Sequence, residues 1–238
     1  MSTCFIADLH LSASQPETVE RFLHFLESDA SRHDALYILG DLFEIWLGDD
    51  LSAPESESIL QALHGVTSSG TPIYIQHGNR DFLLGERFEQ QSGCKLISDP
   101  YLLETDGSRI LLMHGDQLCI DDTSYQRYRN FIRNPLIQWI MLHLPISIRT
   151  RIGQKLRARS DYDKGEKTQE IMDVTKSEVI HTMSRWKSHT LIHGHTHRPA
   201  IHHLEPDGEP AIRIVLGDWE SENNVVIYSN GKFIQQSI

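Results

Sequence analysis

Five apolar runs of this chain each end in side chains that can bind a metal ion. Asp41 is the clearest case, because it follows the run 35–39 after a single glycine. Burying a carboxylate at the end of a strand is costly unless a cation lies beside it. We therefore interpret Asp41 as a metal ligand that bridges two ions.

The other four runs supply the remaining candidate ligands. Side chains two residues apart on an extended chain point to the same side, so a pair of this spacing can reach one ion. Asn79 offers a neutral amide oxygen, whereas Arg80 cannot ligate a metal but presents a planar fork that suits a phosphate oxygen. The predicted metal ligands are Asp8, His10, Asp41, Asn79, His114, His195 and His197.

Each of these short motifs also has a structural interpretation when it is taken alone. Asp8 would serve equally well as a cap for the helix that follows it, and the Gly-Asn-Arg-Asp string around Asn79 is compatible with an ordinary Asx turn. Independent coincidence at the ends of five apolar runs explains the pattern poorly. We therefore interpret the motifs together, as one site.

The predicted ligands combine imidazole nitrogens with carboxylate and amide oxygens and include no thiolate. This mixture suits manganese, iron or zinc rather than a structural zinc–cysteine site or an all-oxygen calcium site. Two such ions about 3.5–4 Å apart activate water at neutral pH and stabilise charge on a phosphoryl group. The pattern thus indicates hydrolysis of a phosphoester or a pyrophosphate.

The elements that must position these residues alternate between strand and helix in the first half of the chain and are richer in strands later. Amphipathic spacing predicts helices over 19–26 and 59–66. At 238 residues the chain is long enough for one domain with a large core. This order predicts an α/β sandwich with mixed sheets. Strands are expected at 4–7, 35–39, 72–75, 109–113, 190–192, 213–216 and 224–228.

Composition narrows the class of protein and its compartment. The formal net charge of -11 argues against general nucleic-acid binding, which needs a basic surface. The three cysteines show no CxxC spacing and predict reduced thiols. The first residues enter a strand without an export signal, and no apolar run approaches the roughly 20 residues that span a bilayer. We therefore expect that the protein is made and retained in the cytosol.

The segment 124–160 has a charge opposite to that of the whole chain. It contains no Asp or Glu, and its apolar residues are flanked by arginines and lysines. This pattern fits a helical cap with an apolar groove for acyl chains and a basic rim that contacts anionic lipid headgroups. The alternative is a buried helical hairpin whose basic side chains are solvated. The basic residues are Arg127, Arg129, Arg133, Arg149, Arg151, Lys155, Arg157 and Arg159.

The five motifs, D-x-H, G-D, G-N-R-D, H-G-D and G-H-T-H, occur in an order that resembles the calcineurin-like metallophosphoesterases. The resemblance implies a four-layer α/β/β/α sandwich. It assigns one metal to Asp8, His10, Asp41 and His197, and the other to Asp41, Asn79, His114 and His195. It further implies that catalysis depends on Asp41, Asn79, Arg80, His114 and His195.

Longer strings, including YILGDLFEIWLGDD and HGNRDFLLG, are similar to one branch of that family, the UDP-2,3-diacylglucosamine hydrolases of lipid A biosynthesis. This resemblance implies two Mn²⁺ ions per chain and attack of water on the phosphorus next to uridine, giving UMP and 2,3-diacylglucosamine 1-phosphate. It also implies peripheral attachment to the cytoplasmic face of the inner membrane. The chain is then expected to form a single domain over 1–238, with the cap inserted at about 122–170.

The same resemblance implies a set of substrate contacts. Tyr125 and Arg157 are further candidates, for which packing of the cap against the core is an equal alternative. The sequence predicts no particular oligomeric state. The implied contacts are Asn79, Arg80, Asp122, Ser160, Lys164, Lys167 and His195.

Two other functions remain as alternatives. A dimetal phosphodiesterase acting on a cyclic nucleotide or a small phosphodiester shares the metal chemistry but needs no basic, apolar cap. A scaffold that has lost catalysis commonly lacks metal ligands, whereas this sequence contains the whole motif set. Loss of lipid hydrolysis but not of small-diester hydrolysis on deletion of the cap would separate the first alternative from the lipid-linked substrate.

Overall fold

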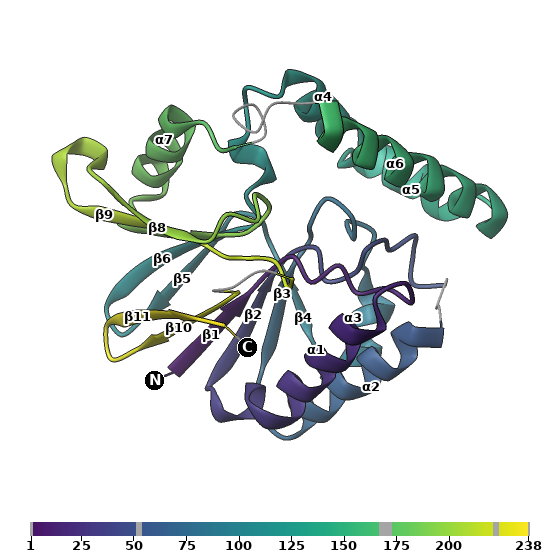
Figure 1. Cartoon of the computed structure of the whole chain (residues 1–238), viewed down its shortest axis with the longest axis horizontal. Helices are drawn as coiled ribbons and strands as arrows, with labels where there is room; N and C mark the ends of the chain where they lie inside the picture. Colours follow the sequence, from purple (N-terminus) through teal and green to yellow (C-terminus); the bar gives the residue numbers. More distant parts are fainter. Residues whose placement is uncertain (1, 51–53, 167–172, 221–223, 238) are drawn as a thin grey trace.

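A computed structural model describes residues 2–50, 54–166, 173–220 and 224–237 of the chain. A six-stranded mixed sheet forms one half of the core (Figure 1), in the order β11-β10-β1-β2-β3-β4. Strands β1 to β4 run parallel, and β10 and β11 are antiparallel to their neighbours. The bounds are β1 Ser2–Ile6, β2 Ala35–Leu39, β3 Ile73–Gln76, β4 Lys95–Ile97, β10 Val225–Ser229 and β11 Lys232–Gln236.

A five-stranded mixed sheet forms the other half, in the order β5-β6-β7-β9-β8. Its three central strands β6, β7 and β9 are parallel, and β5 and β8 are antiparallel edge strands. The bounds are β5 Tyr101–Thr105, β6 Ser108–Met113, β7 Thr190–His193, β8 Ala200–Leu204 and β9 Ala211–Val215. The α/β class and the mixed sheets predicted from the sequence are confirmed.

The alternation of side chains along the strands sets the order of the layers. Phe5 and Tyr37 pack between the two sheets, together with Ile110 of β6. The intervening residues Ile6 and Ile38 point to the opposite face, where helices cover them. Each central strand is therefore apolar on both faces, as expected for parallel strands buried between layers.

Helices complete the four layers (Figure 1). Helices α1 Pro16–Ser28, α2 Pro54–Ser68 and α3 Glu86–Ser92 cover the outer face of the six-stranded sheet, and α7 Lys176–Trp186 covers that of the five-stranded sheet. In α1 the buried residues Phe22, Phe25 and Leu26 form the apolar stripe that the spacing predicts. Short 3₁₀ helices lie at η1 Ala30–Arg32, η2 Asp116–Leu118 and η3 Pro206–Gly208.

Three helices between β6 and β7 stand apart from the layers, at the upper right of Figure 1. They are α4 Thr123–Ile132, α5 Pro135–His143 and α6 Ile146–Glu166, here called the helical insertion. Asp122 and Asn134 cap the first two of these helices, each by accepting a hydrogen bond from a backbone N–H. Within the described residues, no helix is both long and apolar enough to cross a bilayer.

The hairpin alternative for this segment is wrong, because much of its apolar surface faces solvent. Every residue of α5 is at least partly exposed; Leu136 is 63% and Trp139 58% exposed. Several of the basic side chains are also engaged by the chain itself. Arg129 pairs with Asp116, and Arg149 pairs with Asp50.

Arg149 fastens α6 to the core. This residue is 1% exposed, and its Nη1 donates to the carbonyl of Leu47 at 2.7 Å and to Asp50 Oδ1 at 2.7 Å. Removing a buried donor leaves its acceptors without a partner, which is costlier than losing the hydrogen bond alone. Arg149 thus holds the insertion on the core, although the sequence pattern predicted that the basic residues of this segment contact an external anionic partner.

Arg149→Met is therefore expected to lower the free energy of unfolding by about 1–3 kcal/mol. The half-exposed carboxylate of Asp50 regains water in the variant, so most of the loss comes from the Leu47 carbonyl and from the packing of α6. Urea unfolding of both proteins measures the change. Arg151→Met, at an exposed position of the same helix, is the control and should leave stability within about 0.5 kcal/mol. Equal stability of the two variants would contradict the anchoring role.

Candidate metal centre

The candidate ligands lie at one edge of the molecule because the parallel strands of both sheets end there. Register pairs Ile6 of β1 with Ile38 of β2, and Met113 of β6 with His193 of β7, so the carboxyl ends are level. The loops are joined across the edge by backbone hydrogen bonds, including His10 N to Asp41 O at 3.0 Å. Ligand sites of open α/β sheets form at such carboxyl ends.

Two groups of side chains converge closely enough to hold a metal ion. Asp8, His10 and His197 form one group, and Asp8, Asp41 and His114 form the other, with the ligand atoms of each within 4.8 Å of one another. Carboxylate Oδ2 of Asp41 lies 3.9 Å from His10 Nδ1 and 3.9 Å from His114 Nε2. Asp8 is common to both groups, and Asp41 lies between His10 of the first group and His114 of the second.

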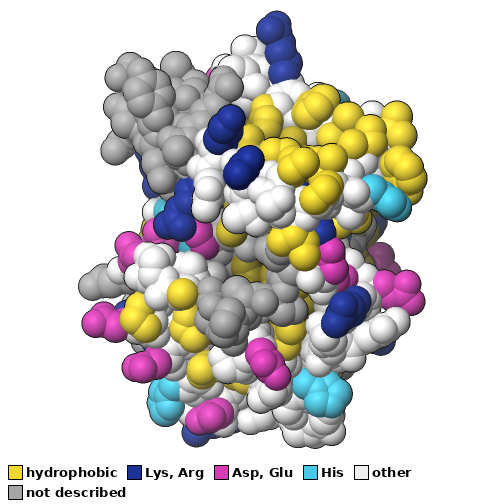
Figure 2. Space-filling model, turned by 90° about the vertical axis from the view of Figure 1, so that its right-hand side faces the viewer, with side chains coloured by type: hydrophobic (Ala, Val, Ile, Leu, Met, Phe, Trp, Pro, Cys, Tyr) yellow, Lys and Arg dark blue, Asp and Glu magenta, His cyan; other side chains and the backbone are white. Residues whose placement is uncertain are grey.

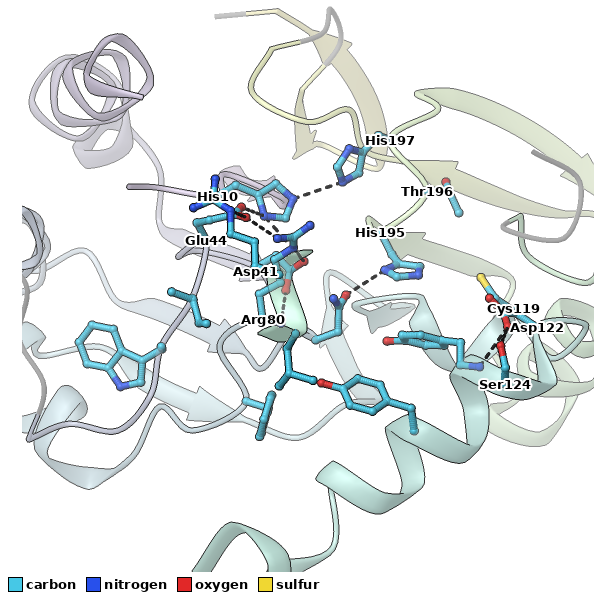
Figure 3. Close-up of a pocket in the computed structure, with 18 of the residues that line it drawn as sticks. His10, Asp41, Glu44, Arg80, Cys119, Asp122, Ser124, His195, Thr196 and His197 are labelled. Atoms are coloured by element: carbon cyan, nitrogen blue, oxygen red, sulfur yellow. Dashed lines mark hydrogen bonds and ion pairs between the residues drawn. The ribbon is translucent and has the colours of Figure 1, made fainter. Parts of the chain in front are cut away.

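The two remaining predicted ligands lie beside the second group. Asn79 Oδ1 is 3.0 Å from His114 Nε2 and 3.1 Å from His195 Nδ1. The backbone N–H of His195 donates to Asp8 Oδ2 at 2.7 Å. Thus the structure brings together all seven residues that the sequence nominated, from five separate loops. Figure 3 shows this convergence of His10, Asp41, His195 and His197.

Five of the seven candidate ligands have a left-handed backbone conformation. Asp8, His10, Asp41, His195 and His197 have φ values between 51° and 70°. Such values are uncommon for residues other than glycine and cost free energy that the surrounding structure must supply. Their concentration at one edge is typical of a functional site.

In two of the histidines, a hydrogen bond made by Nδ1 determines that Nε2 is the nitrogen that can bind a metal. His114 Nδ1 donates to the carbonyl of Leu39 at 2.9 Å, since a carbonyl can only accept. His197 Nδ1 lies 2.9 Å from Asp218 Oδ2, which likewise accepts. Each neutral ring then presents the lone pair of Nε2 to the site. Hydrogen bonds of this kind orient histidine ligands in metalloproteins.

Facing acceptors show that the site favours a positive charge. With its Nδ1–H used, neutral His114 aims a lone pair at the oxygen of Asn79, 3.0 Å away. The Nε2 atoms of His10 and His197 also lie close together, 3.3 Å apart. Two facing acceptors need a proton or a cation between them. The donor set of imidazoles, carboxylates and an amide oxygen therefore fits a pair of divalent metal ions.

The pKa values report the same excess of negative charge. Burial by itself lowers the pKa of His114, but the carboxylates of Asp41 and its neighbours outweigh this and raise the pKa to about 9. Burial is likewise outweighed at His197, where Asp8 and Asp218 raise the pKa to about 10. Burial raises the pKa of Asp41 to about 7, against the pull of His114. These buried carboxylates are stabilised by positive charge placed among them.

A cavity of about 530 Å³ opens beside the candidate metal centre. Polar residues occupy one end, among them Asp41, Asn79 and His195. The rest of its wall is largely apolar and is shared between the core and the helical insertion. This apolar wall consists of Ile45, Trp46, Leu47, Phe82, Met141 and Leu156, with Tyr125 and Tyr128. The arrangement can place a phosphoryl group at the metals while its apolar substituent lies under the insertion.

Comparison with known proteins identifies the family. The sequence model of the calcineurin-like phosphoesterases matches residues 1–199, which is most of the chain. The chain belongs to the calcineurin-like phosphoesterase family. The metal motifs all fall within the matched residues.

Among calcineurin-like phosphoesterases, the chain is similar to proteins named UDP-2,3-diacylglucosamine hydrolase. The one from Pseudomonas entomophila is 51% identical over 215 residues, which cover 90% of this chain and 90% of that protein. The one from Photobacterium profundum is 47% identical over 227 residues, covering 95% of this chain and 93% of that protein. A solved archaeal phosphodiesterase shares the fold, with a TM-score of 0.50 at 11% identity over 99% of this chain and 98% of its own.

Only some of the residues that the sequence nominated as substrate contacts have side chains that the structure of this phosphoesterase describes. The cavity is lined by Asn79, Arg80, Asp122 and His195. Ser160 and Lys164 lie within the span of α6, but their side chains are outside the described part of the structure. Lys167 lies outside the described residues altogether.

Tyr125, which the sequence left between packing and binding, packs the insertion against the core and also lines the cavity. Its ring lines the cavity and lies against the ring of His195, with centroids 5.8 Å apart. Its hydroxyl donates to buried Asp116 at 2.9 Å, and Arg129 donates to the same carboxylate oxygen at 2.8 Å. Burial and the Asp116 carboxylate raise the pKa of Tyr125 well above its ordinary value, so the hydroxyl stays protonated. The helical insertion is thereby tied to the H-G-D loop that carries His114.

Two acidic residues of the site were missed at the level of sequence. Asp218 follows β9 in the string Leu-Gly-Asp, the same string that places Asp41 after β2, so its signal was present. Glu44 contacts Arg80, Arg157 and His10, and nothing in its local sequence indicates those partners.

Proposed function

We propose that this calcineurin-like phosphoesterase hydrolyses the pyrophosphate bond of UDP-2,3-diacylglucosamine, giving UMP and 2,3-diacylglucosamine 1-phosphate. The observation that supports this substrate most directly is a cavity that joins a two-group Asp/His centre to a large apolar wall. A free nucleotide or a phosphopeptide has no long apolar chain to pack against that wall, whereas a substrate with two acyl chains does. The names of the similar proteins support the same substrate.

We propose that two Mn²⁺ ions occupy this centre. Asp8, His10, Asp41 and His197 would hold one, and Asp41, Asn79, His114 and His195 would hold the other. When bound, such ions lower the pKa of water and stabilise charge on a phosphoryl group. Manganese accepts the mixed imidazole and oxygen donors that converge here.

The protein's own residues bind and orient the phosphates. The guanidinium of Arg80 lies at the polar end of the cavity, with Nε 4.0 Å from Asp41 Oδ2, so a phosphoryl group in contact with Arg80 is beside the candidate centre. The leaving group is a sugar phosphate, which is already a weak base and needs no strong general acid. From the resemblance to UDP-2,3-diacylglucosamine hydrolases, we assign further substrate contacts to Asn79, Asp122, Ser160, Lys164, Lys167 and His195.

Product analysis by mass spectrometry tests this function. Metal-free protein is incubated with UDP-2,3-diacylglucosamine, with and without added Mn²⁺. We expect UMP and the acylated sugar 1-phosphate to be released only when Mn²⁺ is added to the protein. Hydrolysis of bis(4-nitrophenyl) phosphate without cleavage of the lipid would instead favour an enzyme acting on small phosphodiesters.

We also propose that the helical insertion attaches the protein to an anionic membrane surface on the cytoplasmic side. Figure 2 shows hydrophobic side chains gathered on the upper part of the molecule, with Lys and Arg side chains beside them. Arg151 and Lys155 are exposed on α6, and this segment carries no acidic residue from 124 to 160. We call the exposed apolar residues the insertion patch: Phe131, Leu136, Trp139, Ile140, Leu142, Ile146 and Ile148.

Trp139→Ser is expected to weaken binding to vesicles that contain phosphatidylglycerol by roughly tenfold, because an exposed indole is removed from the membrane-facing surface. Co-sedimentation with vesicles measures the change. Ile234→Ser is the matched control, since Ile234 is 56% exposed on β11, outside the insertion. Equal binding by both variants and the unaltered protein would contradict the role of the insertion patch.

A further inference from the structure

The side chain of Glu44 lies where the candidate metal centre, Arg80 and helix α6 meet. It sits on the loop that follows Asp41 and is 12% exposed. Its Oε1 accepts from Arg80 Nη1 and lies 3.3 Å from Arg157 Nε on α6. Its Oε2 lies 3.4 Å from His10 Nδ1. Figure 3 shows Glu44 beside Arg80, Asp41 and His10.

Glu44 and the two arginines also mark the boundary between two cavities. All three residues line the cavity of about 530 Å³ and a second, smaller one of about 220 Å³. The second cavity is bordered by polar residues such as Gln15 and Thr18, and it reaches the candidate ligands as well. A substrate with an apolar half and a polar half, joined by two phosphates, would have its phosphates at this boundary.

One carboxylate between two guanidinium groups has a clear electrostatic effect. Two arginines side by side repel each other, and the charge of Glu44 offsets that repulsion while a net positive charge remains. Each guanidinium has five N–H donors, so one bond to Glu44 leaves donors for a phosphate. Arg157 is 47% exposed, and among the described residues Glu44 is its one ionic partner. Without Glu44, solvent and repulsion would draw Arg157 away.

We propose that Glu44 is a positioning residue that holds Arg80 and Arg157 together so that they bind the two phosphates of a diphosphate substrate. The inference rests on the proposed function, because it needs a substrate with two adjacent phosphates. Glu44 acts through the arginines and does not contact the reacting atoms. It also connects the core loop after β2 to α6, so that the paired arginines form when the helical insertion is seated on the core.

Glu44→Gln tests this role, because it keeps the shape and the accepting oxygen but removes the charge. We expect kcat/KM for UDP-2,3-diacylglucosamine to fall by about ten- to a hundredfold, through weakened charge-assisted hydrogen bonds. Hydrolysis of bis(4-nitrophenyl) phosphate, which has one phosphate, should fall by less than about threefold. Metal content, measured by plasma mass spectrometry, should be unchanged. Glu20→Gln, at an exposed position of α1, is the control for loss of one negative charge.

A double-mutant cycle separates positioning from general disruption. If Glu44 acts through Arg157, Glu44→Gln should cost much less in the Arg157→Ala background than in the unaltered protein. Fully additive losses would overturn the proposal. A fall in metal content would also overturn it, because Glu44 would then act by holding His10.

Failure of the proposed function is distinguishable from failure of this inference. Unaltered protein that cleaves the diester but not the lipid contradicts the proposed function. Binding of UDP, measured by calorimetry without turnover, then decides the inference. UDP should bind about tenfold more weakly to Glu44→Gln than to the unaltered protein, and equal binding overturns the positioning role.

Discussion

Asp41→Asn is expected to lower hydrolysis by at least about a thousandfold and to reduce the metal content below two ions per chain. The substitution is conservative in every other respect. Asparagine tolerates the left-handed backbone conformation of Asp41, whose φ is 52°. Its side-chain oxygen can still accept the hydrogen bond that Arg80 N donates to Asp41 Oδ1 at 2.9 Å. What is lost is the charge and the second ligating oxygen between the two candidate metal groups.

Metal analysis and a phosphodiester assay on the purified variant measure both effects. Asp106→Asn is the matched control, since Asp106 has a φ of 47° and lies exposed in the turn between β5 and β6. This control should keep full activity and metal content. An Asp41→Asn variant that retained two metals and normal turnover would show that Asp41 does not bridge the ions.

Gly78→Ala should disable the centre without changing any ligand. A Cβ atom at Gly78 would lie 2.0 Å from Asp41 Oδ1 and 2.2 Å from Asp41 N, distances that no folded protein accommodates without a shift. Overpacking of this kind costs about 1–3 kcal/mol. The displaced atoms belong to the candidate bridging ligand, so metal content and activity should fall together with stability. Thermal unfolding, metal analysis and the phosphodiester assay measure the three quantities.

Gly65→Ala is the same chemical change as Gly78→Ala, but it is expected to stabilise the protein. Gly65 lies in helix α2, and a Cβ atom there would meet nothing within 4 Å. Alanine is favoured over glycine in a helix, so this variant should gain about 0.5–1 kcal/mol and keep its activity. If both glycine variants behaved alike, close packing of Gly78 against Asp41 would not be the cause of the loss.

Much of the metal centre was accessible from sequence because each part of it is local. Each candidate ligand lies within a few residues of the strand that precedes it, so the apolar run and the polar side chain are read together. Parallel strands bring their carboxyl ends to one edge, and so the ligands of separate loops meet. His193 shows the limit of this logic. It belongs to the same histidine-rich string but is the last residue of β7 and is buried behind the site.

The charge of the helical insertion was a less reliable guide. Its basic residues, which have no acidic neighbours in sequence, were interpreted as a surface for an anionic partner. The structure engages four of them within the chain. Arg129 pairs with Asp116, Arg149 with Asp50 and Arg157 with Glu44, while Arg133 donates to the backbone carbonyls of His77 and Gly78. Most of these partners lie far away in sequence, where no local pattern connects them.

The sequence by itself determined the α/β class, the family and the set of candidate ligands, because periodicity and strand-end motifs are encoded within short segments. Tertiary structure alone decided how those ligands are supported. Asp218 accepts from His197, Asp116 joins Tyr125 to Arg129, and Glu44 gathers Arg80 with a helix more than a hundred residues away. Such contacts depend on how separate layers pack, and side-chain packing across layers leaves no periodic trace in the chain.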